Sequence, residues 1–187
     1  MQQASADSRT PEGYLHGSSI IAEIKASQIE FVISVPDITT SEGLLRPLAQ
    51  ESGKDESGKE TAPRLIRVCK EDEGVGICAG LSYCGRRSLL LIQQTGLLDS
   101  INAIRGVAVE YALPICMMVG LLEKEPGVPP RQSKRYGVRI VEPVLEAMGI
   151  TYHEIEGEAD VGAIGPAIET AYAQMRPVVL LIGRRPS

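Results

Sequence analysis

The chain has 187 residues, 43% hydrophobic and 23% charged, a composition ordinary for one globular domain with a full-sized core. Its 19 basic and 24 acidic residues give a net charge of −5 without a block of Lys or Arg, which disfavours nucleic acid and anionic membranes as partners. No run reaches the roughly 18 apolar residues of a membrane span, and we expect a cytoplasmic protein. The first dozen residues are polar, so we expect a flexible tail at 1–12 and a single domain over 13–187.

The first predicted elements are a short amphipathic helix over 13–27 and a buried strand over 31–35. Pro36 ends the strand. A polar turn follows, in which Thr40 or Ser41 is placed to cap a second helix.

Residues 51–60 repeat the tetrapeptide ESGK, and this charged, low-complexity segment predicts a solvated loop. The segment also spells the G-x-x-x-x-G-K pattern of a phosphate-binding loop over 53–59. However, Glu60 stands where that loop needs Ser or Thr for magnesium, and no strand precedes it. We therefore do not expect a nucleotide to bind here.

A strand predicted over 64–68 leads into the most informative helix of the chain. Three acids fill its first turn: Glu71, Asp72 and Glu73. Acids at this position complement the helix dipole and can simply be solvated. The helix also contains three glycines: Gly74, Gly76 and Gly80. Because each glycine costs about 1 kcal/mol against alanine, three of them suggest close approach by a neighbouring backbone or a ligand.

The rest of the chain alternates apolar strands with helical segments. Strands are predicted over 87–93, 114–119, 152–155 and 177–182, and helices over 98–111, 138–148 and 159–175. The chain thus holds apolar runs that do not alternate with polar residues, separated by helical segments. This pattern is typical of a parallel sheet covered on both faces, and we predict a doubly wound α/β fold. No G-x-G-x-x-G follows a strand, so the dinucleotide-binding version of this fold is not supported.

A proline-rich loop is predicted over 120–137. It carries most of a basic group: Lys124, Arg131, Lys134, Arg135 and the nearby Arg139. A loop of this length can be a lid, a partner surface or a solvated connector, and the sequence leaves these alternatives open.

The four cysteines show no C-x-x-C spacing, and with only two histidines in the chain we expect no metal site. Cys69, Cys78, Cys84 and Cys116 are instead predicted to be reduced thiols in the core.

Three motifs resemble the pyrimidine-binding domain of thiamine-diphosphate enzymes. Glu71 opens a helix with Gly80 nine positions on, as in that family. The segment QQTGLLDSINA at 93–103 is similar to the QNSGLGNSIN segment of sulfopyruvate and phosphonopyruvate decarboxylases, and SVPD at 34–37 is similar to their turn after the first strand. The three motifs occur in the family's order.

The resemblance implies roles for individual residues. Glu71 is the expected catalytic residue, hydrogen-bonded to N1′ of the aminopyrimidine of thiamine diphosphate, whose thiazolium serves as the electron sink. The other expected cofactor-binding residues are Pro36, Gln94, Thr95 and Gly96. The expected substrate-binding residues are Asp37, Thr39, Thr40, Gln93 and Asn102.

The family also needs a diphosphate-binding domain in which a Gly-Asp-Gly segment and an Asn hold Mg²⁺, and the chain contains no Gly-Asp-Gly. The resemblance therefore implies an α-type subunit. A separate β-type subunit would bind the diphosphate and Mg²⁺, in a hetero-oligomer that holds further copies of this chain.

The expected substrate is 3-sulfopyruvate, converted to sulfoacetaldehyde and CO₂, with phosphonopyruvate or another 2-oxo acid as the alternative. Leu98 and Asp99 depart from the family's Gly and Asn, and an acid at 99 could repel an anionic substrate. A non-catalytic subunit of the same fold, which binds a ligand or regulates a partner, is the other alternative.

Overall fold

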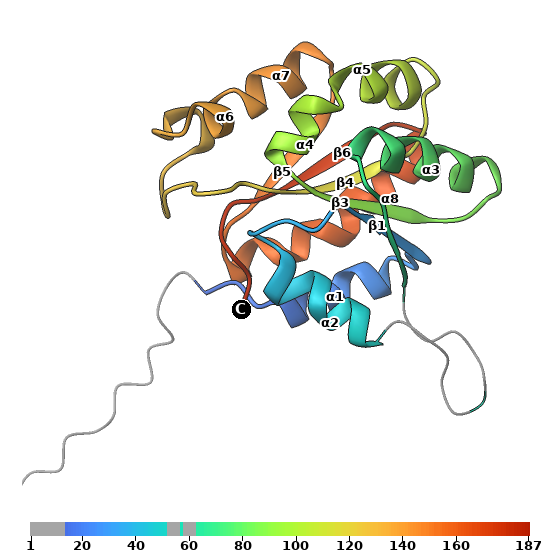
Figure 1. The fold of residues 1–187 in the computed structure, drawn as a ribbon, viewed down its shortest axis with the longest axis horizontal. Helices are drawn as coiled ribbons and strands as arrows, with labels where there is room; N and C mark the ends of the chain where they lie inside the picture. The colour runs from blue at the N-terminus through green and yellow to red at the C-terminus, as the bar shows by residue number, and fades with distance from the viewer. Residues whose placement is uncertain (1–13, 52–56, 58–62) are drawn as a thin grey trace, which may run out of the picture.

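The computed structural model describes residues 14–51, 57 and 63–187 (Figure 1). The predicted tail at 1–12 lies outside the described residues. So does the predicted loop at 51–60, with its G-x-x-x-x-G-K pattern, apart from Glu51 and Ser57.

Six parallel strands form one sheet in the order β2-β1-β3-β4-β6-β5. The strands are β1 (Phe31–Ser34), β2 (Arg64–Arg67), β3 (Ser88–Gln93), β4 (Cys116–Gly120), β5 (Thr151–Ile155) and β6 (Val178–Ile182). Strands β4 and β6 are buried along their whole length, and the edge strands β2 and β5 are partly exposed. The predicted parallel α/β fold is confirmed.

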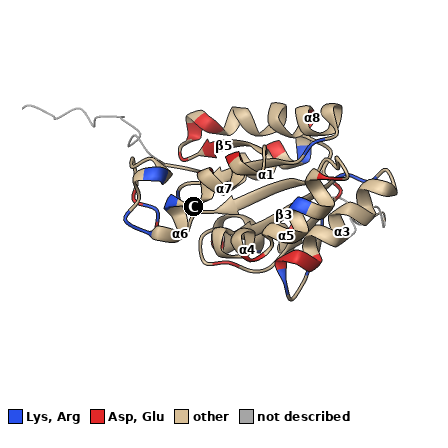
Figure 2. Ribbon diagram, turned by 90° about the horizontal axis from the view of Figure 1, so that it is seen from above, with Lys and Arg blue, Asp and Glu red and all other residues tan. Residues whose placement is uncertain are grey.

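Helices cover both faces of the sheet, as Figure 2 shows with α1 and α8 on one side and α3, α4 and α5 on the other. The first face carries α1 (Gly17–Ala26), the π-helix η1 (Ser41–Leu45), α2 (Arg46–Glu51), the 3-10 helix η4 (Glu158–Ala163) and α8 (Ile164–Gln174). The second face carries α3 (Glu71–Tyr83), α4 (Gln94–Asp99), α5 (Ile101–Ala103), the π-helix η2 (Ile104–Val109), α6 (Tyr136–Arg139) and α7 (Val141–Ala147).

Alternation along the strands builds a separate core on each face. Val32 and Leu91 pack with α1 and α8, whereas their neighbours Ile33 and Leu90 pack with α3. This two-sided burial explains why the central strands β3, β4 and β6 are apolar at nearly every position instead of every second one.

The helix predicted over 98–111 begins earlier and is interrupted. Its first turn starts at Gln94, directly after β3, and Ser100 leaves the helical conformation with φ −95° and ψ 6°. The chain then continues through α5 into the π-helix η2. A π-helix adds one residue to a turn, which the apolar periodicity does not reveal.

The three glycines of α3 differ in their surroundings. A Cβ built on Gly74 would lie 2.6 Å from Leu90 Cδ1, so this glycine allows the helix to pack closely on the sheet. A Cβ on Gly76 or Gly80 would meet nothing within 4 Å, because both lie on the outer face of the helix. Among the residues that the structure describes, the predicted close approach holds for Gly74 and not for Gly76 or Gly80.

The prediction of four core thiols is wrong for two cysteines. Cys78 and Cys116 are buried, but Cys69 and Cys84 are exposed, because the first follows an edge strand and the second lies beyond the last turn of α3. Within the described residues, no helix combines the length and the apolarity needed to cross a membrane.

Candidate active site

Most of the predicted site residues lie where the strand order reverses. The chain leaves β1 toward the outer strand β2 but leaves β3 in the opposite direction, toward β4. In open α/β sheets, ligands bind at such a switch point, beyond the carboxyl ends of the strands. The turn after β1 and the start of α4 after β3 both lie there.

Glu71 and Gly96 are in direct contact, although they belong to separate sequence motifs. Glu71 is the first residue of α3 and Gly96 lies in the first turn of α4. A Cβ built on Gly96 would lie 2.2 Å from Glu71 Oε1 and 2.4 Å from its Cδ. The glycine thus leaves the space that the carboxyl group fills. Among the described residues this half-buried carboxylate has no hydrogen-bond or ion-pair partner.

The polar turn after β1 is built around the buried carboxylate of Asp37. Its Oδ1 accepts hydrogen bonds from the backbone N–H groups of Thr39 (2.6 Å) and Thr40 (2.8 Å), and its Oδ2 accepts one from the Thr40 hydroxyl. Asp37 and Thr40 therefore stabilise the turn itself. The Thr39 hydroxyl is different, since it is buried and has no partner in the described part of the chain.

The end of β4 forms the neighbouring wall. A Cβ built on Gly120 would lie 2.8 Å from Thr39 Cβ and 3.2 Å from Asp37 Oδ1, so the turn after β1 rests on this glycine. Two residues later, the Leu122 N–H donates to the buried Gln94 Oε1 over 2.8 Å. The amide oxygen of Gln94 thus joins the start of α4 to the segment after β4.

Other predicted residues are less closely joined. Pro36 and Thr95 are exposed, and Gln93 is the last residue of β3, paired in the sheet with Gly120. Asn102 is exposed on α5, where its Oδ1 accepts from the Arg105 guanidinium at 3.0 and 3.3 Å. None of the contacts among the described residues connects Asn102 with Glu71 or Gly96.

The acids beside Glu71 share one nearby lysine that the motifs did not single out. Lys70 Nζ lies 3.7 Å from Asp99 Oδ2 and 3.9 Å from Asp72 Oδ2, with all three side chains exposed. Such exposed pairs add little stability. They do place a positive charge next to Asp99, the acid that could repel an anionic substrate.

The basic group of the loop after β4 is mostly paired with acids of the same chain. Arg131 contacts Glu142 and Glu146, and Arg135 contacts Glu123. Lys124 is buried between two glutamates. Spacing alone could not reveal these partners, because they come from segments up to 32 residues away.

No protein-family model matches the chain. It is 30% identical over 124 residues to the sulfopyruvate decarboxylase of Methanosarcina acetivorans, an alignment that covers 63% of this chain and 30% of that protein. Sulfopyruvate decarboxylase subunit alpha of Methanococcus maripaludis is 43% identical over 54 residues (29% of this chain, 32% of that one). The subunit alpha of Methanothermobacter thermautotrophicus is 30% identical over 101 residues (54% and 55%). The chain thus spans about a third to a half of the length of these relatives, and over that part the predicted resemblance to the sulfopyruvate decarboxylases is confirmed.

Proposed function

We propose that the chain is the α-type subunit of a thiamine-diphosphate-dependent 2-oxo acid decarboxylase. The observation that carries the proposal is the pairing of Glu71 with Gly96 at the switch point, with the carboxylate free of partners within the described residues. The similarity to curated sulfopyruvate decarboxylase alpha subunits supports the same reaction class.

The residues present fit the pyrimidine end of the cofactor. A carboxylate without a partner can accept or share a proton with a heterocycle nitrogen, and Gly96 leaves room for it to do so. Glu71 would hold the proton at the aminopyrimidine N1′, while Pro36, Thr95 and Gly96 would line that end of the site. Thiamine diphosphate, when bound, would supply the electron sink for the bonding electron pair that stays on the substrate carbon when carbon dioxide leaves. The Mg²⁺ and the diphosphate would be held by the partner subunit.

The substrate would lie beside the turn after β1. The buried Thr39 hydroxyl retains its hydrogen-bonding capacity and is the best-placed polar group of this turn for a carboxylate or oxo group. Asp37 and Thr40 would contribute mainly by holding the turn. The leading substrate is 3-sulfopyruvate, which the names of the relatives support, ahead of phosphonopyruvate and other 2-oxo acids.

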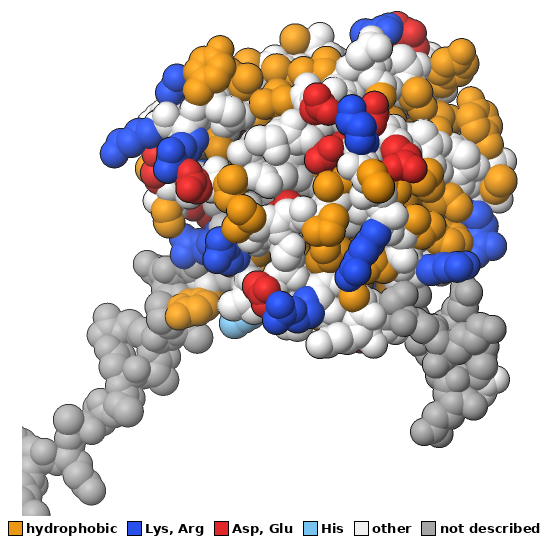
Figure 3. Space-filling model, in the orientation of Figure 1, with side chains coloured by type: hydrophobic (Ala, Val, Ile, Leu, Met, Phe, Trp, Pro, Cys, Tyr) orange, Lys and Arg blue, Asp and Glu red, His pale blue; other side chains and the backbone are white. Residues whose placement is uncertain are grey.

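The partner surface would include the outer face of α3. Gly76 and Gly80 are open there, and Tyr83 and Tyr111 are 71% and 68% exposed. Figure 3 shows hydrophobic side chains gathered over the side of the molecule where α3 and α5 lie. Open glycines and exposed aromatic rings are typical of a surface on which another chain packs closely. We assign this face to the β-type subunit or to a second copy of the chain.

The test is release of carbon dioxide from 3-sulfopyruvate, phosphonopyruvate and pyruvate. The chain is co-expressed with a candidate diphosphate-binding partner and assayed with thiamine diphosphate and Mg²⁺. Turnover that requires both chains and favours one acid is expected. A complex that binds the cofactor but releases carbon dioxide from none of the three acids would argue against the proposed reaction.

A further inference from the structure

A buried lysine outside the predicted motifs occupies the far end of the same sheet edge. The Lys124 side chain has no exposed surface, and its Nζ lies 3.1 Å from Glu154 Oε1 and 2.9 Å from Glu156 Oε2. It also donates to the Glu125 backbone carbonyl over 3.3 Å. A fully buried ammonium is rarely found without such partners, because its desolvation must be offset.

The two glutamates come from the edge strand and reach the lysine because of the strand period. Glu154 lies in β5 and Glu156 just beyond it, so both side chains point to the same face of the sheet. Gly183, which follows β6, provides the space, since a Cβ there would lie 3.1 Å from Glu154 Oε1 and 3.4 Å from Lys124 Cδ. Burial raises the pKa of Glu154, and the nearby ammonium opposes that rise.

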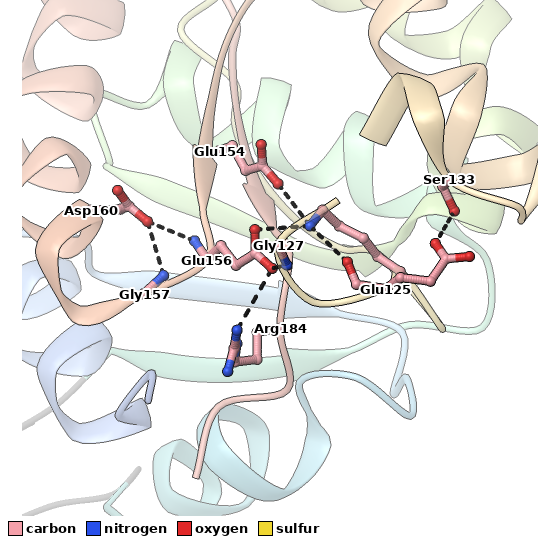
Figure 4. Close-up of polar contacts among 9 residues, drawn as sticks. Glu125, Gly127, Ser133, Glu154, Glu156, Gly157, Asp160 and Arg184 are labelled. Atoms are coloured by element: carbon pink, nitrogen blue, oxygen red, sulfur yellow. Dashed lines mark hydrogen bonds and ion pairs between the residues drawn. The ribbon is translucent and has the colours of Figure 1, made fainter. Parts of the chain in front are cut away.

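Glu156 extends the cluster to two further segments. Its Oε1 accepts a hydrogen bond from the Gly127 N–H (2.7 Å) and lies 3.8 Å from the Arg184 guanidinium (Figure 4). The segment after β4 is thereby fixed to the ends of both β5 and β6. A backbone bond from the Leu121 N–H to the Ile182 carbonyl (2.9 Å) adds to this connection.

These contacts of Lys124 and Glu156 lie within two residues of the segment that contacts the candidate active site. Leu122, which donates to Gln94, and Lys124 flank Glu123, whose φ of 59° is the left-handed conformation that a non-glycine residue seldom adopts. Such a turn persists only when its neighbours are held on both sides. Gln94 holds one side and the buried ammonium the other.

We propose that Lys124 is a positioning residue of the candidate active site. Its ion pairs with Glu154 and Glu156 hold the backbone turn at 121–124 in place. Through the hydrogen bond from Leu122, this segment positions Gln94 and the start of α4, where Gly96 contacts Glu71. The proposal concerns the same site as the proposed function. Its structural consequence does not depend on the reaction.

The test compares amide hydrogen exchange of the full chain in four forms: wild type, Lys124→Met, Lys124→Arg and Lys134→Met. The exposed Lys134, in the same loop, is the matched control. Lys124→Met is expected to speed exchange by roughly tenfold or more in peptides over 120–124 and over 93–97, while α1 peptides keep the wild-type rate. Lys124→Arg should restore slow exchange in part, and Lys134→Met should change nothing.

The alternatives give distinct results. Faster exchange over 120–124 alone would mean that Lys124 holds only its own loop, and equal acceleration in α1 would mean that it merely stabilises the fold. Either result overturns the proposal. If Lys124→Met does not fold, the variant Lys124→Met with Glu154→Gln and Glu156→Gln removes all three charges, and the same comparison decides.

Activity gives a second readout with the partner subunit present. Lys124→Met should lower kcat by roughly tenfold or more with a smaller change in KM, because it displaces the catalytic geometry rather than a substrate contact. An unchanged kcat would contradict the positioning role. An inactive wild-type complex would instead count against the proposed function, and the exchange comparison would still decide the role of Lys124.

Discussion

The contact between Glu71 and Gly96 makes the glycine a sensitive residue of the site. In Gly96→Ala, the new methyl group would occupy the position of the Glu71 carboxyl, which lies at the end of a flexible side chain and can rotate away. We therefore expect the free energy of unfolding to change by less than about 1 kcal/mol. Decarboxylation by the complex should fall by about 100-fold, because the carboxyl would leave its position.

Gly162→Ala serves as the control for this prediction, since a Cβ on Gly162 meets nothing within 4 Å and the residue lies on the opposite face of the sheet. Urea unfolding and carbon dioxide release are measured for both variants. Wild-type activity in Gly96→Ala would show that the observed position of Glu71 is not the active one.

Because two thiols are buried, we expect the free energy of unfolding to fall at alkaline pH. Burial raises the pKa of Cys78 to about 11 and that of Cys116 to about 12, from 9.0. The folded chain therefore keeps both protons where the unfolded chain releases them. Their contribution to stability is complete below about pH 9 and is lost as the pH rises through about 11 to 12.

Urea titrations at about pH 7.5 and about pH 10 should show a lower free energy of unfolding at the higher pH. The fall should be smaller in the double variant Cys78→Ala and Cys116→Ala. It should not vanish, because burial also raises the pKa of Tyr172, to about 12. A fall of the same size in the double variant would show that these thiols do not cause it.

The outer face of α3 gives a prediction about the whole element. In Gly80→Ala, the methyl group enters open space in the isolated chain, and the free energy of unfolding should rise by about 1 kcal/mol because alanine favours the helix. If another subunit packs on this face, the same change should weaken assembly. Unfolding of the isolated chain and sedimentation of the complex measure the two effects. Assembly at wild-type strength would place the partner elsewhere.

The elements that the sequence predicted well are those that one apolar pattern defines. The buried strands fall close to their predicted positions, as β6 does at Val178–Ile182 against 177–182. The start of α4 was missed because Thr95 and Gly96 are weak helix formers directly after a strand. The contact between Gly96 and Glu71 is not visible in the sequence. The π-helix η1 was missed because the polar turn before it hides the extra residue.

Within the site, motifs predicted individual residues but not their contacts. The sequence placed Glu71 at a helix start and Gly96 in a separate motif, and only the sheet order brings them together. The Asp-x-Thr-Thr pattern at 37–40 carried a signal for a side-chain-to-backbone turn that explains the buried state of Asp37. Lys124 carried no signal, since its partners lie 30 and 32 residues further on.

At the scale of the whole molecule, the carboxyl edge of the sheet has two different halves. At the β1 and β3 end, a carboxylate and a hydroxyl remain without partners in the described residues. At the β4, β5 and β6 end, Lys124 and its glutamates are paired with one another. The half at β1 and β3 is thus open to a ligand. The half at β4, β5 and β6 is closed by ion pairs that stabilise the neighbouring wall of the site.

The measurement that tests this account most directly compares Glu71→Gln with Glu73→Gln in the complex with the partner subunit. Both changes remove one acid from the first turn of α3, but only Glu71 contacts Gly96. Carbon dioxide release from 3-sulfopyruvate should be abolished in Glu71→Gln and should stay near the wild-type rate in Glu73→Gln, with both complexes assembled. Near-wild-type turnover by Glu71→Gln would remove Glu71 from the mechanism and contradict the central claim.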